Sequence, residues 1–149
     1  SWQSALKALA ISLQLGDEVV IISTSTGSSF ALKLAQLFPE KVKALVNLSP
    51  NIRVKDPASY LLNKPWGLEI ANLVLGEKRV VTGQSQEYAK YWDTVYTVNA
   101  LVELQELLES ALREETFMNI HQPVLNLYYF KNEEEQDQVI SVDKIFWMH

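Results

Sequence analysis

The chain has 149 residues, of which 48% are hydrophobic and 21% charged, which is ordinary for one globular domain with a core. A net charge of −5 with scattered Lys and Arg argues against a nucleic-acid partner. The absence of Cys excludes disulfides and a thiol nucleophile, and two His exclude a His-rich metal site. No apolar run reaches the roughly 18 residues that span a bilayer, and no signal peptide is visible. We expect no transmembrane segment and a cytoplasmic location.

The first fifty residues predict a helix, a strand, a helix and a strand. Apolar side chains recur every third or fourth position over residues 2–15, which indicates a helix. Residues 19–22 form a continuous β-branched run, typical of a strand buried on both faces of a parallel sheet. A second helix ends at Pro39, and a second buried strand covers 42–48.

The middle of the chain, residues 51–99, changes character. It is rich in Pro, Gly and aromatic residues, and it is too apolar to remain a solvated linker. We expect an inserted helical subdomain, with short helices near 68–75 and 87–95.

The last third predicts a helix, a strand and a helix. Leucines on one stripe indicate a helix over about 100–115, and Pro123 opens a third strand, 124–130. A polar loop, 131–138, leads to a last helix that begins near Ser141.

Strands that alternate with helices indicate an α/β fold with parallel strands. We divide the chain into a first core part, 1–50, a helical cap insertion, 51–99, and a second core part, 100–149. The chain begins inside one predicted helix and ends inside another, so we expect it to be part of a longer protein. Three strands leave a sheet edge exposed, and this edge is expected to pair with missing sequence or with another copy of the chain.

A strand that runs directly into a turn of small residues and then a helix is the pattern of a nucleophile elbow. With Ser25 at the centre, the residues two places away are Ser23 and Gly27, both small; with Ser23 at the centre, one would be the bulky Ile21. Ser25 is therefore the candidate nucleophile, and the amide of Thr26 is a candidate oxyanion donor. Two alternatives stay open: the turn simply caps the helix, or it holds a phosphate.

Segments 15–27, 35–42 and 44–50 together resemble the central block of the α/β-hydrolase superfamily, and 122–128 resembles its next core strand. The insertion resembles the helical cap of serine esterase-like and lysophospholipase-like members. The resemblance implies a partial α/β-hydrolase fold, no cofactor and no metal, and a small ester or lipid-like substrate. One departure is Ser23, where the family usually has Gly.

The resemblance places the acid of a Ser–His–Asp triad in the loop after the third strand, where the pattern of 137–141 makes Asp137 the candidate. Glu133, Glu134 and Glu135 lie just upstream, and one of them replacing Asp137 stays an alternative.

Neither histidine suits the base. His121 precedes a strand, and the starts of parallel strands lie opposite the elbow. His149 follows Asp137 too closely for the family pattern, so we expect the base, like the second oxyanion donor, outside this chain.

Three aromatic side chains of the insertion, Trp66, Tyr88 and Trp92, are candidates for an acyl pocket, although the cap's own small core is an alternative role. Two functions follow. The first is a serine hydrolase acting on an ester, thioester or amide through an acyl-enzyme, with this chain alone inactive. The second is a non-catalytic interaction domain that retains the architecture.

Overall fold

The computed structural model describes residues 1–82 and 85–148. The chain forms two compact units: unit 1 comprises Ser1–Lys55 with Leu108–His149, and unit 2 comprises Asp56–Leu107. One helix, α4 (Val98–Ala111), begins in unit 2 and ends in unit 1. The predicted boundaries after residues 50 and 99 stay a prediction.

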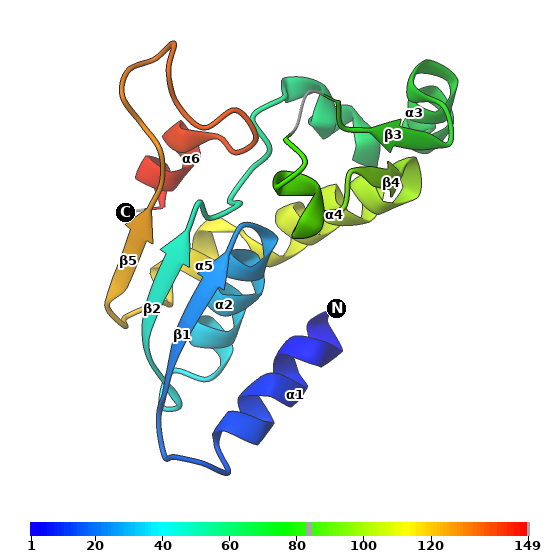
Figure 1. The fold of residues 1–149 in the computed structure, drawn as a ribbon. Coiled ribbons are helices and arrows are strands. Elements are labelled where there is room, and N and C mark those ends of the chain that lie inside the picture. Colours follow the sequence, from blue (N-terminus) through cyan, green and yellow to red (C-terminus); the bar gives the residue numbers. More distant parts are fainter. Residues whose placement is uncertain (83–84, 149) are drawn as a thin grey trace. The chain divides into compact units, whose positions relative to one another are not determined.

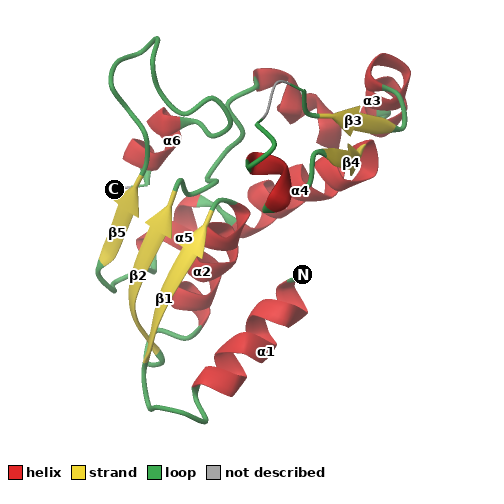
Figure 2. Ribbon diagram, in the orientation of Figure 1, coloured by secondary structure: helices red, strands yellow, loops and turns green. Residues whose placement is uncertain are grey.

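Unit 1 contains a sheet of three parallel strands in the order β1-β2-β5, which lie side by side and point the same way (Figure 1, Figure 2). This confirms the expected α/β fold with a parallel sheet. The helices and strands that lie entirely within unit 1 are α1 (Trp2–Ser12), β1 (Val19–Thr24), α2 (Thr26–Leu37), β2 (Val42–Leu48), α5 (Glu114–Met118), β5 (Val124–Leu127) and α6 (Val142–Trp147).

Helix α2 covers one face of the sheet, and α1 and α5 pack beside it. Leu32 and Ala35 of α2 and Val42 and Leu45 of β2 are buried, because the helical stripe of α2 meets the inward side chains of the strands. Trp2 of α1 stacks on Phe30 of α2 with ring centroids 6.3 Å apart.

The expectation that residues 19–22 are buried on both faces is wrong for this chain. Burial alternates along β1, and Val20 and Ile22 are 56% and 72% exposed. Both lie on the exposed face of β1, and α2 packs on the strand from the other face. A continuous β-branched run indicates that a strand has apolar side chains on both faces. It does not show that the rest of the chain packs against both of them.

Further buried side chains lie outside the sheet, in the segment after β2, just past the end of α4 and around the start of α6. They are Ile52, Leu112, Ile140 and Ile145. The backbone joins two of these segments, because Val54 forms an antiparallel bridge with Ile140.

Arg53, in the segment after β2, binds backbone carbonyls at the end of α4. Its guanidinium donates hydrogen bonds to the carbonyls of Leu108 and Leu112, at 2.9 and 2.8 Å, and to that of Ile52 at 2.7 Å. Burial lowers the pKa of Arg53, and the charge of Glu109 partly opposes this. The helix expected over 100–115 is consequently two helices, α4 and α5, with an extended residue, Arg113, between them.

Replacing Arg53 by Met should lower the free energy of unfolding by about 2–3 kcal/mol, because it leaves carbonyls of a helix end without their donors. Arg53→Lys should recover little, since one ammonium cannot span two carbonyls as the planar guanidinium does. Urea denaturation followed by circular dichroism measures the loss. The control is Lys43→Met, which removes an exposed ion pair with Glu18 and should cost about 0.5 kcal/mol or less. Equal losses in both variants would contradict the role given to Arg53.

Unit 2 differs from the helical insertion that the sequence predicts. Its elements are the 3₁₀ helix η1 (Pro57–Asn63), α3 (Gly67–Leu75), β3 (Lys78–Val80), the 3₁₀ helix η2 (Tyr88–Lys90), β4 (Val95–Thr97) and the first part of α4. The short helix near 68–75 corresponds to α3. The helix expected over 87–95 is wrong, because only one 3₁₀ turn forms there. The chain then enters β4, which pairs antiparallel with β3.

Gly67 is the first residue of α3. A Cβ atom at this position would clash with the carbonyl oxygens of Leu61 and Leu62, so any side chain forces the backbone to shift. Gly67→Ala should destabilise unit 2 by about 2 kcal/mol, a typical penalty for overpacking. Urea denaturation followed by circular dichroism measures this loss. Gly16→Ala, whose Cβ meets only an ordinary contact at 3.8 Å, is the control and should stay within about 0.5 kcal/mol of the unaltered protein.

Candidate functional site

Ser25 occupies the turn between β1 and α2 at the carboxyl end of the sheet. Its backbone angles are φ 52° and ψ −123°, a conformation that a residue with a side chain rarely adopts. Such strain costs about 1–3 kcal/mol and persists only where the surroundings enforce it. The turn between β1 and α2 is therefore sharp, and its backbone is strained at Ser25.

Backbone hydrogen bonds hold both sides of this residue. The amide of Ser25 donates to the carbonyl of Leu48 at the end of β2, at 2.9 Å. The carbonyl of Ser25 accepts from the amides of Ser28 and Asn51, at 3.0 and 3.1 Å. Ser25 is thus tied to its own helix and to the end of the neighbouring strand.

The hydroxyl of Ser25 does not cap the helix. Ser25 occupies the N-cap position of α2, but its side chain makes no capping hydrogen bond. The half-buried Thr26 is the first residue of α2, so its amide is among the four at a helix start that have no carbonyl partner within the helix. The helix start supplies the partial positive charge that favours an anion at this place.

The small residues around Ser25 have more room than the pattern implies. A Cβ atom at Gly27 would lie 3.8 Å from Cβ of Ser23, an ordinary van der Waals distance. Ser23 in place of the family's usual Gly is therefore sterically compatible with the turn.

Beneath the turn lies a row of polar side chains that was not predicted from the sequence. Ser23, Asn47 and Asn126 are neighbours across β1, β2 and β5. Ser23 Oγ is hydrogen-bonded to Asn47 Oδ1 at 2.7 Å and to Ser28 Oγ at 2.9 Å. Asn47 Nδ2 donates to Asn126 Oδ1 at 2.8 Å. An Asn inside each of two mostly apolar strands was the available signal.

Asp137 lies in the loop after β5, at the same end of the sheet as Ser25. The preceding residues form a closed excursion, since Phe130 bridges Gln136 and the amide of Asp137 donates to the carbonyl of Tyr129 at 3.0 Å. Although the loop is long, the backbone of Asp137 is therefore hydrogen-bonded to Tyr129, which lies only two residues after the end of β5. In the strand order, β2 separates the two candidate residues.

The carboxylate of Asp137 is held by its own loop. Oδ1 accepts from the amides of Val139 and Ile140, at 2.8 and 3.1 Å. The Lys55 ammonium donates to the backbone carbonyl of Asp137 at 3.0 Å, which ties the loop to the segment after β2. One oxygen thus orients the group, an arrangement suited to a carboxylate that positions a histidine.

The three upstream glutamates are in a different situation. Glu135 accepts hydrogen bonds from Lys131 Nζ at 2.5 Å and from the Tyr129 hydroxyl at 2.6 Å, and these bonds lower its pKa. The same contact raises the pKa of Tyr129. Glu133 and Glu134 are exposed on the excursion. Glu135 therefore serves to close the excursion.

His121 is exposed and precedes β5, at the opposite end of the sheet from Ser25. His149 lies outside the described residues. No base is assigned to Ser25 within the part of the chain that the structure describes.

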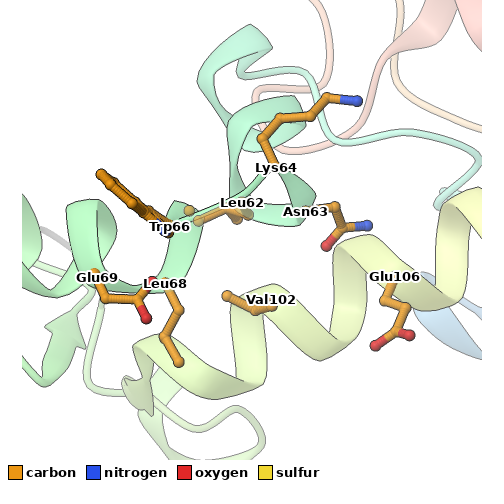
Figure 3. Close-up of a pocket in the computed structure, with 9 residues that line it drawn as sticks. Leu62, Asn63, Lys64, Trp66, Leu68, Glu69, Val102 and Glu106 are labelled. Carbon is orange, nitrogen blue, oxygen red and sulfur yellow. The ribbon is translucent and has the colours of Figure 1, made fainter.

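The three candidate substrate-binding aromatics occupy two places within unit 2. Trp66, itself 77% exposed, lines a pocket of about 350 Å³ (Figure 3). Leu62 from η1, Leu68 from α3 and Val102 from α4 form the apolar part of this pocket. Tyr88 and Trp92 stack on each other instead, with centroids 6.1 Å apart. In this stack Tyr88 is half-buried and Trp92 is 49% exposed, so both roles considered for these side chains stay predictions.

Within residues 1–82 and 85–148, no group of three or more His, Cys, Asp or Glu side chains is arranged to hold a metal ion. Within the same residues, every helix is too short or too polar to cross a membrane.

The fold is an α/β arrangement with a parallel sheet of three strands, and Ser25 lies at the turn between β1 and α2. The described chain is similar to a solved structure from work on LipS and LipT, two metagenome-derived lipolytic enzymes, with a TM-score of 0.73 at 16% sequence identity. The match covers 96% of this chain and 54% of that enzyme, so this chain spans about half of its length. No protein-family model matches the sequence, and no curated protein matches it.

Proposed function

We propose that this chain carries the nucleophile and the acid of a serine hydrolase that cleaves a carboxylic ester, or a thioester or amide, through an acyl-enzyme. Ser25 attacks the carbonyl carbon, the amide of Thr26 stabilises the oxyanion, and Asp137 orients the base. The observation that carries the proposal is the strained conformation of Ser25 at a strand-to-helix turn, with a hydroxyl that the helix does not use. The architecture shared with a lipolytic enzyme supports an ester as substrate.

A fluorophosphonate probe tests the proposal on the full-length natural protein. The probe should attach covalently to Ser25, as peptide mass spectrometry would show, and Ser25→Ala should remove the label. Ser12→Ala, which changes a half-buried serine of α1 whose hydroxyl donates to the carbonyl of Ala8, is the matched control and should leave labelling intact. A folded full-length protein that takes up no label would favour the alternative, a non-catalytic interaction domain with the same architecture.

The 149-residue chain by itself should hydrolyse a p-nitrophenyl ester no faster than its Ser25→Ala variant does, because His121 lies at the other end of the sheet from Ser25. Without a base, a serine hydroxyl is a weak nucleophile at neutral pH. Absorbance of released p-nitrophenol measures the rate. Turnover that Ser25→Ala abolishes would contradict this expectation and require a base within the chain.

A further inference from the structure

The polar row beneath Ser25 connects the two arms of the turn. Ser23 lies two residues before Ser25, on β1, and Ser28 lies three residues after it, on α2. The hydrogen bond between their hydroxyls, at 2.9 Å, spans the turn from strand to helix. Asn47 extends this connection to β2, and Asn126 extends it to β5.

Burial makes this connection strong. Ser28 and Asn47 are both 0% exposed, so neither side chain exchanges its partner for bulk water. A buried polar group that loses its partner costs the full desolvation penalty, which exceeds the gain from an average hydrogen bond. Breaking any one hydrogen bond of the row consequently has a high cost in free energy.

Ser28 links the row directly to the strained residue. Its hydroxyl bonds to Ser23, while its backbone amide donates to the carbonyl of Ser25 at 3.0 Å. Fixing the Ser28 side chain against β1 therefore fixes the donor that holds Ser25. A strained backbone persists only where such contacts over-determine it.

We propose that Ser23, Ser28 and Asn47 are positioning residues that clamp the turn and hold the Ser25 hydroxyl in the orientation for attack. The effect of the clamp on catalysis rests on the proposed function. It also explains Ser23 at a position where the resembled family usually has Gly: here the hydroxyl supplies the central link of the clamp. None of the three residues touches the substrate.

The test compares Ser23→Ala and Ser28→Ala with Thr116→Val in the full-length natural protein. Thr116 is 2% exposed, and its hydroxyl donates to the carbonyl of Ala111 at 2.8 Å, so its variant loses an equally buried hydrogen bond away from the turn. Two quantities are measured well below the unfolding temperature: the rate of fluorophosphonate labelling at Ser25, and amide hydrogen exchange at Ser28 and Asn51.

Both clamp variants should label about tenfold more slowly and exchange these amides about tenfold faster than the unaltered protein, the scale of one lost hydrogen bond. Thr116→Val should change neither quantity, even where its unfolding temperature falls equally. Ser23→Thr, which keeps a hydroxyl, should restore both.

Wild-type labelling and exchange in Ser23→Ala would overturn the clamp while leaving the proposed function standing. If the unaltered protein takes up no label, the proposed function fails, and the exchange rates alone decide whether the clamp holds the turn. If Thr116→Val accelerated amide exchange at Ser28 and Asn51 equally, the effect of the clamp variants would reflect only a loss of overall stability. That result would overturn the clamp.

Discussion

Replacing Ser25 by glycine should raise the free energy of unfolding by about 1 kcal/mol while abolishing covalent labelling and ester hydrolysis by the full-length protein. Glycine adopts a positive φ without the steric cost that a Cβ atom incurs at 52°. The relieved strain exceeds the entropy that glycine adds to the unfolded chain. Urea denaturation measures the stability, and the expected rise corresponds to about 3 °C in the unfolding temperature.

Ser25→Ala separates the two effects, because alanine removes the hydroxyl but keeps the Cβ atom. This variant should lose labelling completely while its stability stays within about 0.5 kcal/mol of the unaltered protein. A Ser25→Gly protein that is less stable than Ser25→Ala would show that the backbone at this turn is not strained. Residual labelling at another residue would place the nucleophile elsewhere.

Asp137→Asn should lower kcat for ester hydrolysis by the full-length protein by about 10⁴-fold, the scale seen when a triad carboxylate becomes an amide. The amide oxygen of Asn can still accept from the amides of Val139 and Ile140, so the loop should stay folded. What is lost is the negative charge that orients and stabilises a protonated base. Steady-state kinetics with a p-nitrophenyl ester measures kcat, and circular dichroism checks the fold.

Glu135→Gln is the matched control for this prediction, since it removes one carboxylate charge from the same loop. Its partners are Lys131 and Tyr129, so the change should weaken the closed excursion and leave kcat within about twofold. The reverse result, with Glu135→Gln inactive and Asp137→Asn active, would move the acid to Glu135.

Much of the core could be predicted because local patterns and tertiary packing agree there. The strand over 42–48 has the predicted bounds, and its Val42 and Leu45 side chains are buried on the side where α2 packs. The helix expected over 100–115 was too long, because the Arg53 guanidinium, far away in sequence, binds the carbonyls where α4 ends. The helix expected over 87–95 did not form, since residues from Val95 onward pair with β3 instead.

At the candidate site, too, some features could be predicted from the local sequence and others depend on tertiary contacts. Small residues around Ser25 indicated the turn, because the requirement for space is local to five successive residues. The orienting hydrogen bonds of Asp137 and the closed excursion before it depend on how the chain returns to Tyr129. The row of Ser23, Asn47 and Asn126 depends on the register of three strands, which no single segment contains.

The sequence by itself determined the alternation of helices and strands, the class of fold, and the serine at the strand-to-helix turn. Each of these follows from periodicity and residue size within a short stretch of chain. Only the tertiary structure decided the strain at Ser25, the partners of its neighbours, and the open sheet face that carries Val20 and Ile22. These features arise from contacts between residues distant in sequence, whose geometry depends on strand order and register rather than on local preference.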